Sequence, residues 1–338
     1  MIYALPADVL NTSHPAHRKD TMMSHQAPVG TVAAPAPPEP PTRPGLRGHV
    51  RRFPLTWFFG LAFLLSWVAW TPYILSENGL GVLHFAFPSV LGTSQLLGVI
   101  PGAYLGPVLS ALVVTVVADG RPGLRAWIGR MTKWRVGWSW YVGIAIAVPA
   151  VLTLTTVLLS GQRPGMPSAV LLAAYIPGLI LQILTTGLAE EPGWRDFAMP
   201  RLQHKFGPLR GTLVLGPLWG VWHLPLFLSE WGGWPDVSWD KPVEFLAITV
   251  AFSFVMTWVF NHTGQSLLLA MVLHTSVNNF FSVAWSDMFP SLSFRYTDHA
   301  FLVSSVVVAV VLLVATRGRL GCPPDAVGGP AGPRWAQR

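Results

Sequence analysis

The sequence is poor in charge. Charged residues make up only 11% of the 338 residues, whereas a soluble globular protein carries about 25%. Hydrophobic residues account for 51%, and the mean hydropathy is +0.47. This balance excludes an ordinary cytosolic enzyme, a disordered protein and a nucleic-acid-binding protein that works through a dense basic surface.

Cysteine is nearly absent as well. The single cysteine, Cys322, excludes an intramolecular disulfide and a cysteine-based metal site. The sequence also lacks a glycine-rich phosphate loop, a Gly-x-Ser-x-Gly elbow and a His-Glu-x-x-His motif. A P-loop nucleotide-binding protein, an α/β-type serine hydrolase and a soluble zincin are therefore excluded as models.

The sequence contains eight long apolar runs. Each run can cross about 30 Å of hydrocarbon at about 1.5 Å per residue. They cover residues 54–76, 97–118, 138–160, 168–190, 208–228, 243–261, 264–284 and 299–316. The stretch 80–96 is apolar but interrupted by Pro88 and Gly92, and we expect it to be interfacial or re-entrant. The predicted fold class is an all-α polytopic membrane protein with about eight transmembrane helices and a polar intramembrane cavity.

The distribution of basic residues predicts the topology. Residues 1–53 are rich in proline and alanine and predict a disordered cytoplasmic tail. Residues 54–316 form the transmembrane domain, and residues 317–338 form a second tail. Alternate connections carry clusters of arginine, and the remaining connections carry at most Arg163, Lys241 or Arg295. By the positive-inside rule both termini are cytoplasmic. Arginine dominates over lysine, which favours the plasma membrane of a bacterium.

A stretch between the second and third runs has helical amphipathicity. Its apolar residues are Leu124, Trp127, Ile128, Met131 and Trp134, and Arg125, Arg130 and Lys133 lie on the opposite face. This pattern indicates either a helix on the cytoplasmic leaflet or one that packs against the bundle.

Few ionisable residues lie within the runs, where each is energetically costly. Glu190 and Glu191 end the fourth run, and two adjacent carboxylates at low dielectric repel unless a cation compensates. Arg195 lies four residues after Glu191 on the same helical face and can supply that charge. Glu190 would then be free to act as a base. The alternative is an interfacial acidic pair with a snorkelling arginine.

Three further polar residues lie within other runs. His223 lies in the fifth, and His274 and Asn278 share one helical face of the seventh. Each histidine could simply form an interhelical hydrogen bond. Together the groups favour either water activation by Glu190 and His223, with oxyanion stabilisation by His274 and Asn278, or a zinc site of His223, His274 and Glu190. The sequence leaves metal dependence open.

These residues resemble the CPBP family of intramembrane endopeptidases, which includes CAAX prenyl proteases of the Ras-converting type and bacterial relatives linked to peptide maturation and bacteriocin self-immunity. The resemblance covers about residues 54–316. It rests on Glu190-Glu191-x-x-x-Arg195, on Trp219-x-x-x-His223, where the family usually has Phe at the first position, and on His274-x-x-x-Asn278. The resemblance implies that Glu190 activates the water and that Glu191 and Arg195 support it. It also implies that His223 holds the water or binds a metal, and that His274 and Asn278 stabilise the oxyanion.

The sequence therefore predicts an intramembrane endopeptidase whose cavity opens toward the cytoplasm. Its expected partners are a membrane-associated protein or peptide substrate and the lipid bilayer, with no nucleic acid. The alternatives are a non-catalytic immunity or scaffold protein and a proton- or cation-coupled transporter. One feature fits poorly, because Glu190 falls near the cytoplasmic edge while His223 lies about 22 Å inside its run.

Overall fold

The computed structural model describes residues 45–322, and the expected tail segments 1–44 and 323–338 lie outside the described residues. The expected N-terminal tail extended to residue 53, but Leu46–Arg52 forms helix α1 immediately before the first long helix. At the other end, residues 317–322 turn back onto the bundle. There the Leu320 side chain is buried, and its carbonyl accepts a hydrogen bond of 2.9 Å from Asn261 Nδ2.

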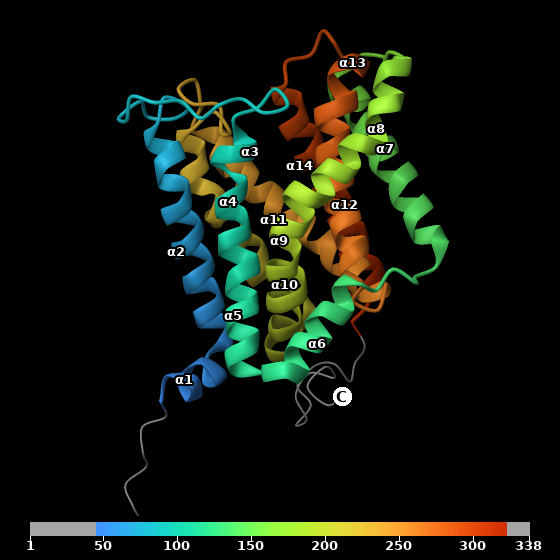
Figure 1. The fold of residues 1–338 in the computed structure, drawn as a ribbon. Coiled ribbons are helices and arrows are strands. Elements are labelled where there is room, and N and C mark those ends of the chain that lie inside the picture. The colour runs from blue at the N-terminus through green and yellow to red at the C-terminus, as the bar shows by residue number, and fades with distance from the viewer. Residues whose placement is uncertain (1–44, 323–338) are drawn as a thin grey trace, which may run out of the picture. The chain divides into compact units, whose positions relative to one another are not determined.

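The described residues are helical and contain no named strand, which confirms the all-α class (Figure 1). The π-helices and the 3-10 helix, labelled η, continue neighbouring α-helices rather than standing alone. In chain order the elements are α1 (Leu46–Arg52), α2 (Pro54–Leu75), α3 (Gln95–Gly98), α4 (Ile100–Ala103), η1 (Tyr104–Val108), α5 (Leu109–Ala118), α6 (Gly120–Met131), α7 (Trp138–Ser160), α8 (Ala169–Gln182), η2 (Ile183–Gly187), α9 (Leu188–Glu191), η3 (Pro192–Ala198), α10 (Met199–His223), η4 (Leu224–Leu228), α11 (Asp240–His262), α12 (Leu267–Asn279), η5 (Phe280–Trp285), α13 (Ser286–Met288) and α14 (Arg295–Thr316).

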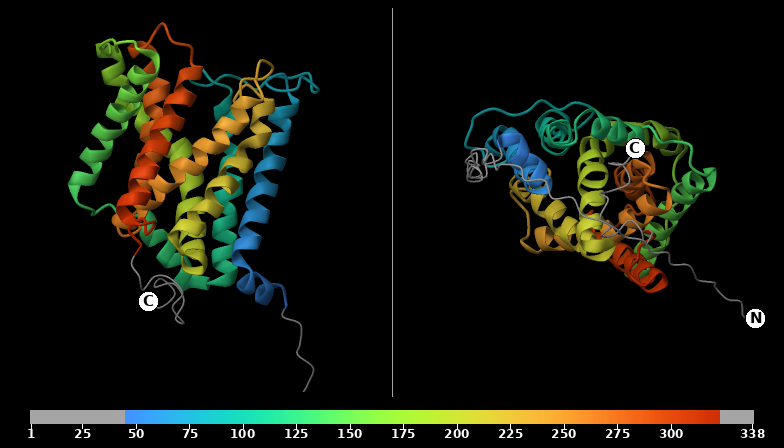
Figure 2. Two further views of the ribbon diagram at one scale, coloured as in Figure 1. Left: turned by 180° about the vertical axis from the view of Figure 1, so that it is seen from behind. Right: turned by 90° about the horizontal axis from the view of Figure 1, so that it is seen from below.

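Seven helical segments in the described part of the chain are long and apolar enough to cross a membrane, rather than the eight expected runs. The difference arises in Ala169–Leu228, which is 60 residues long and contains two of those runs, 168–190 and 208–228. Figures 1 and 2 show successive segments running in opposite directions. Helices α1 and α6 lie at one end of the bundle, and the connections 76–94 and 229–239 lie at the other. The latter end includes the stretch 80–96, whose residues 80–94 are not helical.

A reversal at Gly207 divides the 60-residue segment. Gly207 has φ 78° and ψ 167°, a backbone conformation that is accessible essentially only to glycine. The chain folds back so closely that a Cβ on Gly211 would lie 3.1 Å from the Leu202 carbonyl carbon. Glu190 lies 17 residues before Gly207, and His223 lies 16 residues after it. At about 1.5 Å per residue, two antiparallel arms of nearly equal length bring these residues to the same depth.

The fourth transmembrane segment therefore extends well beyond residue 190, where the expected run ended. The whole of η3 is buried, including Arg195 and Asp196, whose exposed fractions are both 0%. Gly193 permits η3 to approach η1, because a Cβ at this position would lie 2.7 Å from the Pro107 carbonyl oxygen. The poor fit in depth between Glu190 and His223 disappears, because Glu190 lies inside the bundle rather than at its edge.

The amphipathic stretch forms α6 and packs against the bundle. Trp127 is 5% exposed, as expected for its apolar face, whereas Arg121 and Arg125 are exposed. Arg130 departs from the expected pattern, because its guanidinium forms an ion pair with the buried carboxylate of Asp196. Part of the predicted basic face is thus a contact with the fourth transmembrane segment.

Candidate functional site

A cavity of about 280 Å³ gathers most of the polar residues that the sequence singled out. Glu190, His223, His274 and Asn278 line it, together with Trp219. Glu191 and Arg195 lie behind this wall, both with exposed fractions of 0%. The residues come from three separate parts of the sequence, α9 and η3, the end of α10, and α12, as the three spaced motifs predicted.

Glu190 lies in α9, which has π-helical segments on both sides. Such segments insert an extra residue per turn and often occur at functional sites. Its Oε2 accepts a hydrogen bond of 2.8 Å from Trp219 Nε1 and lies 3.9 Å from His223 Nε2. The second distance is too long for a direct hydrogen bond and suits a water held between the two groups.

His223 is held at the last residue of α10. Its Nδ1 lies 2.9 Å from the Trp219 carbonyl oxygen, which can only accept, so Nδ1 carries the proton and Nε2 faces Glu190. The imidazole stacks on Trp231 with a centroid distance of 5.5 Å and an interplanar angle of 16°. The orientation of the ring is therefore fixed on two sides.

Glu191, Arg195 and His274 form a second, fully enclosed group. Arg195 Nε lies 3.2 Å from Glu191 Oε2, so the expected i,i+4 ion pair is present. Glu191 Oε1 lies 2.8 Å from His274 Nδ1. The Glu191 carboxylate therefore orients His274, whose Nε2 is left for the cavity. Arg195 also donates a hydrogen bond of 3.3 Å to Ser253 Oγ, and its Cζ lies 4.7 Å from the Trp219 ring centroid.

Asn278 and Asn279 differ in role despite being neighbours. Asn278 is half-buried and lines the cavity one helical turn after His274. Asn279 faces the other way, is 0% exposed and donates a hydrogen bond of 3.0 Å to the Tyr175 carbonyl oxygen. The structure thus places the asparagine of the motif at the cavity and its neighbour in helix packing.

Sequence reasoning missed several contributors. Ser253 gave no signal, because a serine within an apolar helix is usually bonded to its own backbone. Trp231 lies in a connection, and nothing in the sequence indicated that it would cover His223. Trp219 was expected to begin the second motif and to line the cavity, but the hydrogen bond from its indole N–H to Glu190 was not predicted.

The expected zinc ligands do not form a metal site as arranged. Among residues 45–322, no group of three His, Cys, Asp or Glu side chains is placed to hold a metal ion. Glu190 Oε2 and both histidine Nδ1 atoms already have protein partners. The Nε2 atoms of His223 and His274 remain directed at the cavity, so a zinc ion here stays a prediction, and no step proposed below uses one.

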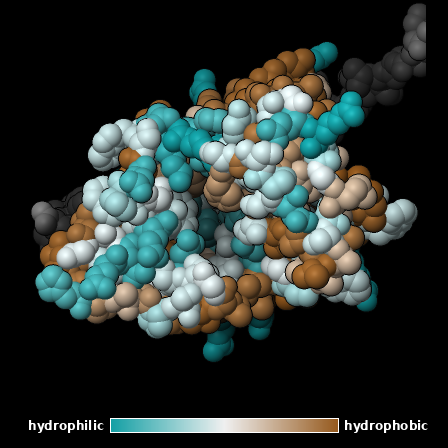
Figure 3. Space-filling view, turned by 90° about the horizontal axis from the view of Figure 1, so that it is seen from above, coloured by the Kyte–Doolittle hydropathy of each residue, from teal (hydrophilic) through white to brown (hydrophobic). Residues whose placement is uncertain are grey.

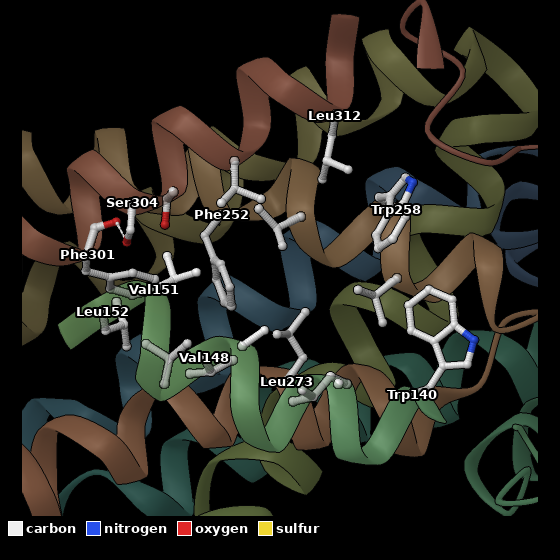
Figure 4. A pocket seen from close by; sticks show the side chains of 18 residues that line it. Trp140, Val148, Val151, Leu152, Phe252, Trp258, Leu273, Phe301, Ser304 and Leu312 are labelled. Carbon is white, nitrogen blue, oxygen red and sulfur yellow. Dashed lines mark hydrogen bonds between the residues drawn. The ribbon is translucent and has the colours of Figure 1, made fainter. Parts of the chain in front are cut away.

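A second cavity of about 330 Å³ lies beside the polar one, between α7, α11, α12 and α14 (Figure 4). Its lining is almost entirely apolar, with Ser304 and Ser305 as the hydroxyl-bearing exceptions. Phe252 and Phe301 line both cavities, and their rings contact each other edge to face with a centroid distance of 5.0 Å. No ionisable side chain lines this second cavity, so the candidate site residues lie on the polar side of the two phenylalanines.

The lining of the polar cavity extends toward the end that carries the connection 76–94. Leu91 and Thr93 of that connection belong to the lining, as does Trp231. Seen from this end, the surface is hollowed near its centre (Figure 3). At the opposite end, η3 is buried, and Trp127 of the arginine-rich helix α6 donates a hydrogen bond to its first residue, Pro192. This placement differs from the expected opening, which the sequence put on the side of the basic residues.

The fold and site define a multi-pass membrane protein with a buried glutamate and histidine cluster. A family model described as Type II CAAX prenyl endopeptidase Rce1-like matches residues 172–280, which include all six candidate site residues. The CAAX prenyl protease 2 of Methanococcus maripaludis is 24% identical over 230 residues, covering 64% of this chain and 82% of the relative. The three motifs and these two matches make the chain similar to the CAAX prenyl protease-like intramembrane endopeptidases.

Proposed function

We propose that this protein hydrolyses a peptide bond of a membrane-associated substrate with a water molecule activated by Glu190 and His223. The observation that carries the proposal is the distance of 3.9 Å between Glu190 Oε2 and His223 Nε2 within a cavity. One water can hydrogen-bond to both atoms at this separation. The indole N–H of Trp219 fixes the carboxylate, so the reacting water would be held without rearrangement.

In this mechanism Glu190 accepts a proton from the water, and the oxygen attacks the carbonyl carbon of the substrate. The carbonyl oxygen gains negative charge. His274, as an imidazolium whose Nδ1–H is bonded to Glu191, donates from Nε2, and Asn278 donates from its carboxamide. Glu190 then returns the proton to the departing amine. One water is consumed, and a new carboxyl group and a new amine are produced.

The substrate is proposed from similarity. The relative from Methanococcus maripaludis is named a CAAX prenyl protease, so a peptide with a farnesylated CAAX end is the first probe. The proposed location is the plasma membrane, with both termini cytoplasmic because the basic connections lie at the end of the bundle that carries α1 and α6.

The experiment compares newly formed protein termini in membranes from cells that express wild type or Glu190→Ala at matched levels. Purified protein is then assayed with an internally quenched, farnesylated CAAX peptide and with any peptide spanning a terminus that disappears. We expect Glu190→Ala, His223→Ala and His274→Ala to abolish cleavage while the protein remains folded in detergent. Equal termini and equal cleavage for wild type and Glu190→Ala would refute the proposal and favour binding or transport.

A further inference from the structure

The helix α6 touches the catalytic segment at the residue that follows the two glutamates. Trp127 Nε1 donates a hydrogen bond of 3.0 Å to the carbonyl oxygen of Pro192. Trp127 is 5% exposed, so this is an interior contact. The indole therefore fixes the start of η3 directly after Glu191.

A second contact lies one turn further along both elements. Arg130 forms an ion pair with the side chain of Asp196, and its Nη2 donates to the Asp196 carbonyl oxygen at 3.3 Å. The Asp196 side chain is 0% exposed, while that of Arg130 is 12% exposed. Asp196 directly follows Arg195, which pairs with Glu191. Arg130 therefore holds the backbone next to that ion pair.

The residues after α6 contact the helix that carries His274. Lys133 Nζ donates to the Gly264 carbonyl oxygen at 2.6 Å, and the Lys133 carbonyl accepts from Ser266 Oγ at 2.7 Å. Ser266 is the N-cap of α12 and accepts a hydrogen bond from Leu269 N. His274 follows two turns later in the same helix.

Residues 120–133, which we call the strap, thus contact the two segments that carry Glu191 and His274, which are hydrogen-bonded to each other. We infer that the strap sets the distance between η3 and α12, and that Arg130, acting through Asp196, and Trp127 are positioning residues for the glutamates and His274. This inference rests on the proposed function, because it assigns the strap a role in that reaction. None of the strap residues lines the polar cavity, so they act through η3 and α12 rather than on the substrate.

A purely structural role makes a different prediction. If the strap only added stability, its variants would unfold at lower temperature, but each folded molecule would turn over normally. If it positions the carboxylates, kcat falls with little change in KM, because the groups in contact with the reacting atoms move while the cavity still binds substrate. A displacement of about 1 Å can cost roughly 100-fold in rate.

The test measures kcat, KM and thermal unfolding of full-length protein in detergent with the quenched, farnesylated CAAX peptide or the peptide identified from the termini. Arg130→Ala is compared with Arg130→Lys, with Asp196→Ala and with the double variant Arg130→Ala/Asp196→Ala. Arg125→Ala is the matched control, because Arg125 is an exposed arginine of the same helix. Trp127→Phe is the mildest variant, since it removes the indole donor and keeps an aromatic ring at this position.

We expect kcat of Arg130→Ala to fall by roughly 10- to 100-fold at unchanged KM. Arg130→Lys should recover part of this loss of kcat, and Arg125→Ala should have the kcat of wild type. The double variant should be no slower than Arg130→Ala, because both changes break the same contact. A kcat for Arg130→Ala within about twofold of wild type, with cleavage still dependent on Glu190, would overturn the inference alone. If Arg130→Ala does not fold, an unchanged kcat in Trp127→Phe overturns it, and a lowered kcat supports it. Equal activity of wild type and Glu190→Ala would instead refute the proposed function.

Discussion

The buried ion pair between Glu191 and Arg195 allows stability and activity to be separated. Both side chains are 0% exposed, and Nε and Oε2 are 3.2 Å apart. Arg195→Met removes the cation and leaves the Glu191 carboxylate in the interior with His274 as its remaining close partner. The double variant Arg195→Met/Glu191→Gln removes both charges, and the glutamine carbonyl can still accept a hydrogen bond from His274 Nδ1.

The geometry sets the size of the effect. At an effective dielectric constant of about 20, two unit charges at this separation attract by about 5 kcal/mol. Breaking a buried pair by removing one partner costs about 3–5 kcal/mol, whereas replacing both charges by neutral groups is often close to neutral. At about 2 °C per kcal/mol for a large domain, Tm of Arg195→Met should fall by about 6–10 °C. The double variant should recover most of this loss.

Activity should behave differently from stability. The double variant lacks the carboxylate that stabilises the imidazolium form of His274 in the proposed reaction, so kcat should stay low although Tm recovers. The assay combines tryptophan fluorescence on heating in detergent with cleavage of the quenched peptide. Asp240→Asn is the control, because Asp240 forms an exposed ion pair with Arg295, and we expect only a marginal change in Tm.

Two results would refute this reasoning. The first is an Arg195→Met protein that unfolds at the wild-type temperature, which would mean that the carboxylate of Glu191 does not need its cation. The second is a double variant that is as unstable as Arg195→Met. In that case the cost would come from lost packing of the arginine rather than from an unpaired charge.

Three further predictions follow from other parts of the structure. Gly207→Ala should lower the free energy of unfolding by about 1–3 kcal/mol. It should also lower kcat, because the reversal at Gly207 aligns Glu190 with His223. Gly60→Ala in α2 is the control, since its Cβ would meet no atom within 4 Å. Metal chelators should leave cleavage unchanged, because the described residues contain no three-ligand group, and a stoichiometric metal in active protein would contradict this. Alkaline phosphatase should be active when inserted between residues 229 and 239 and inactive at the C-terminus, and the opposite pattern would invert the proposed topology.

Much of the helical framework can be predicted from hydropathy alone. The runs 54–76 and 138–160 correspond to α2 and α7 within one residue at each end, because these helices present apolar side chains to the bilayer along most of their length. The spacing of the motifs also predicted the ion pair of Glu191 with Arg195, since residues four apart on a helix are neighbours.

The depth of the site could not be predicted in the same way. Hydropathy ended the fourth run at residue 190, where the polar residues begin. The following residues nevertheless remain inside the bundle, because Arg195 pairs with Glu191, Asp196 pairs with Arg130, and Gln203 exchanges hydrogen bonds with Asn261. Two of these three partners lie more than 50 residues away in the sequence. A hydropathy profile cannot include them.

The same residues explain why the cavity lining extends toward the end of the bundle opposite the basic connections. Charges after residue 190 were counted as a cytoplasmic connection, so a site beside them was expected to open on that side. In the structure, η3 and α6 fill this end, and their charges neutralise one another inside the protein. The arginines that mark the topology are thus of two kinds. Exposed ones such as Arg121 and Arg125 support the positive-inside argument, whereas Arg130 and Arg195 belong to the interior that supports the site. Only the exposed kind should be counted when a side of the membrane is assigned to the cavity.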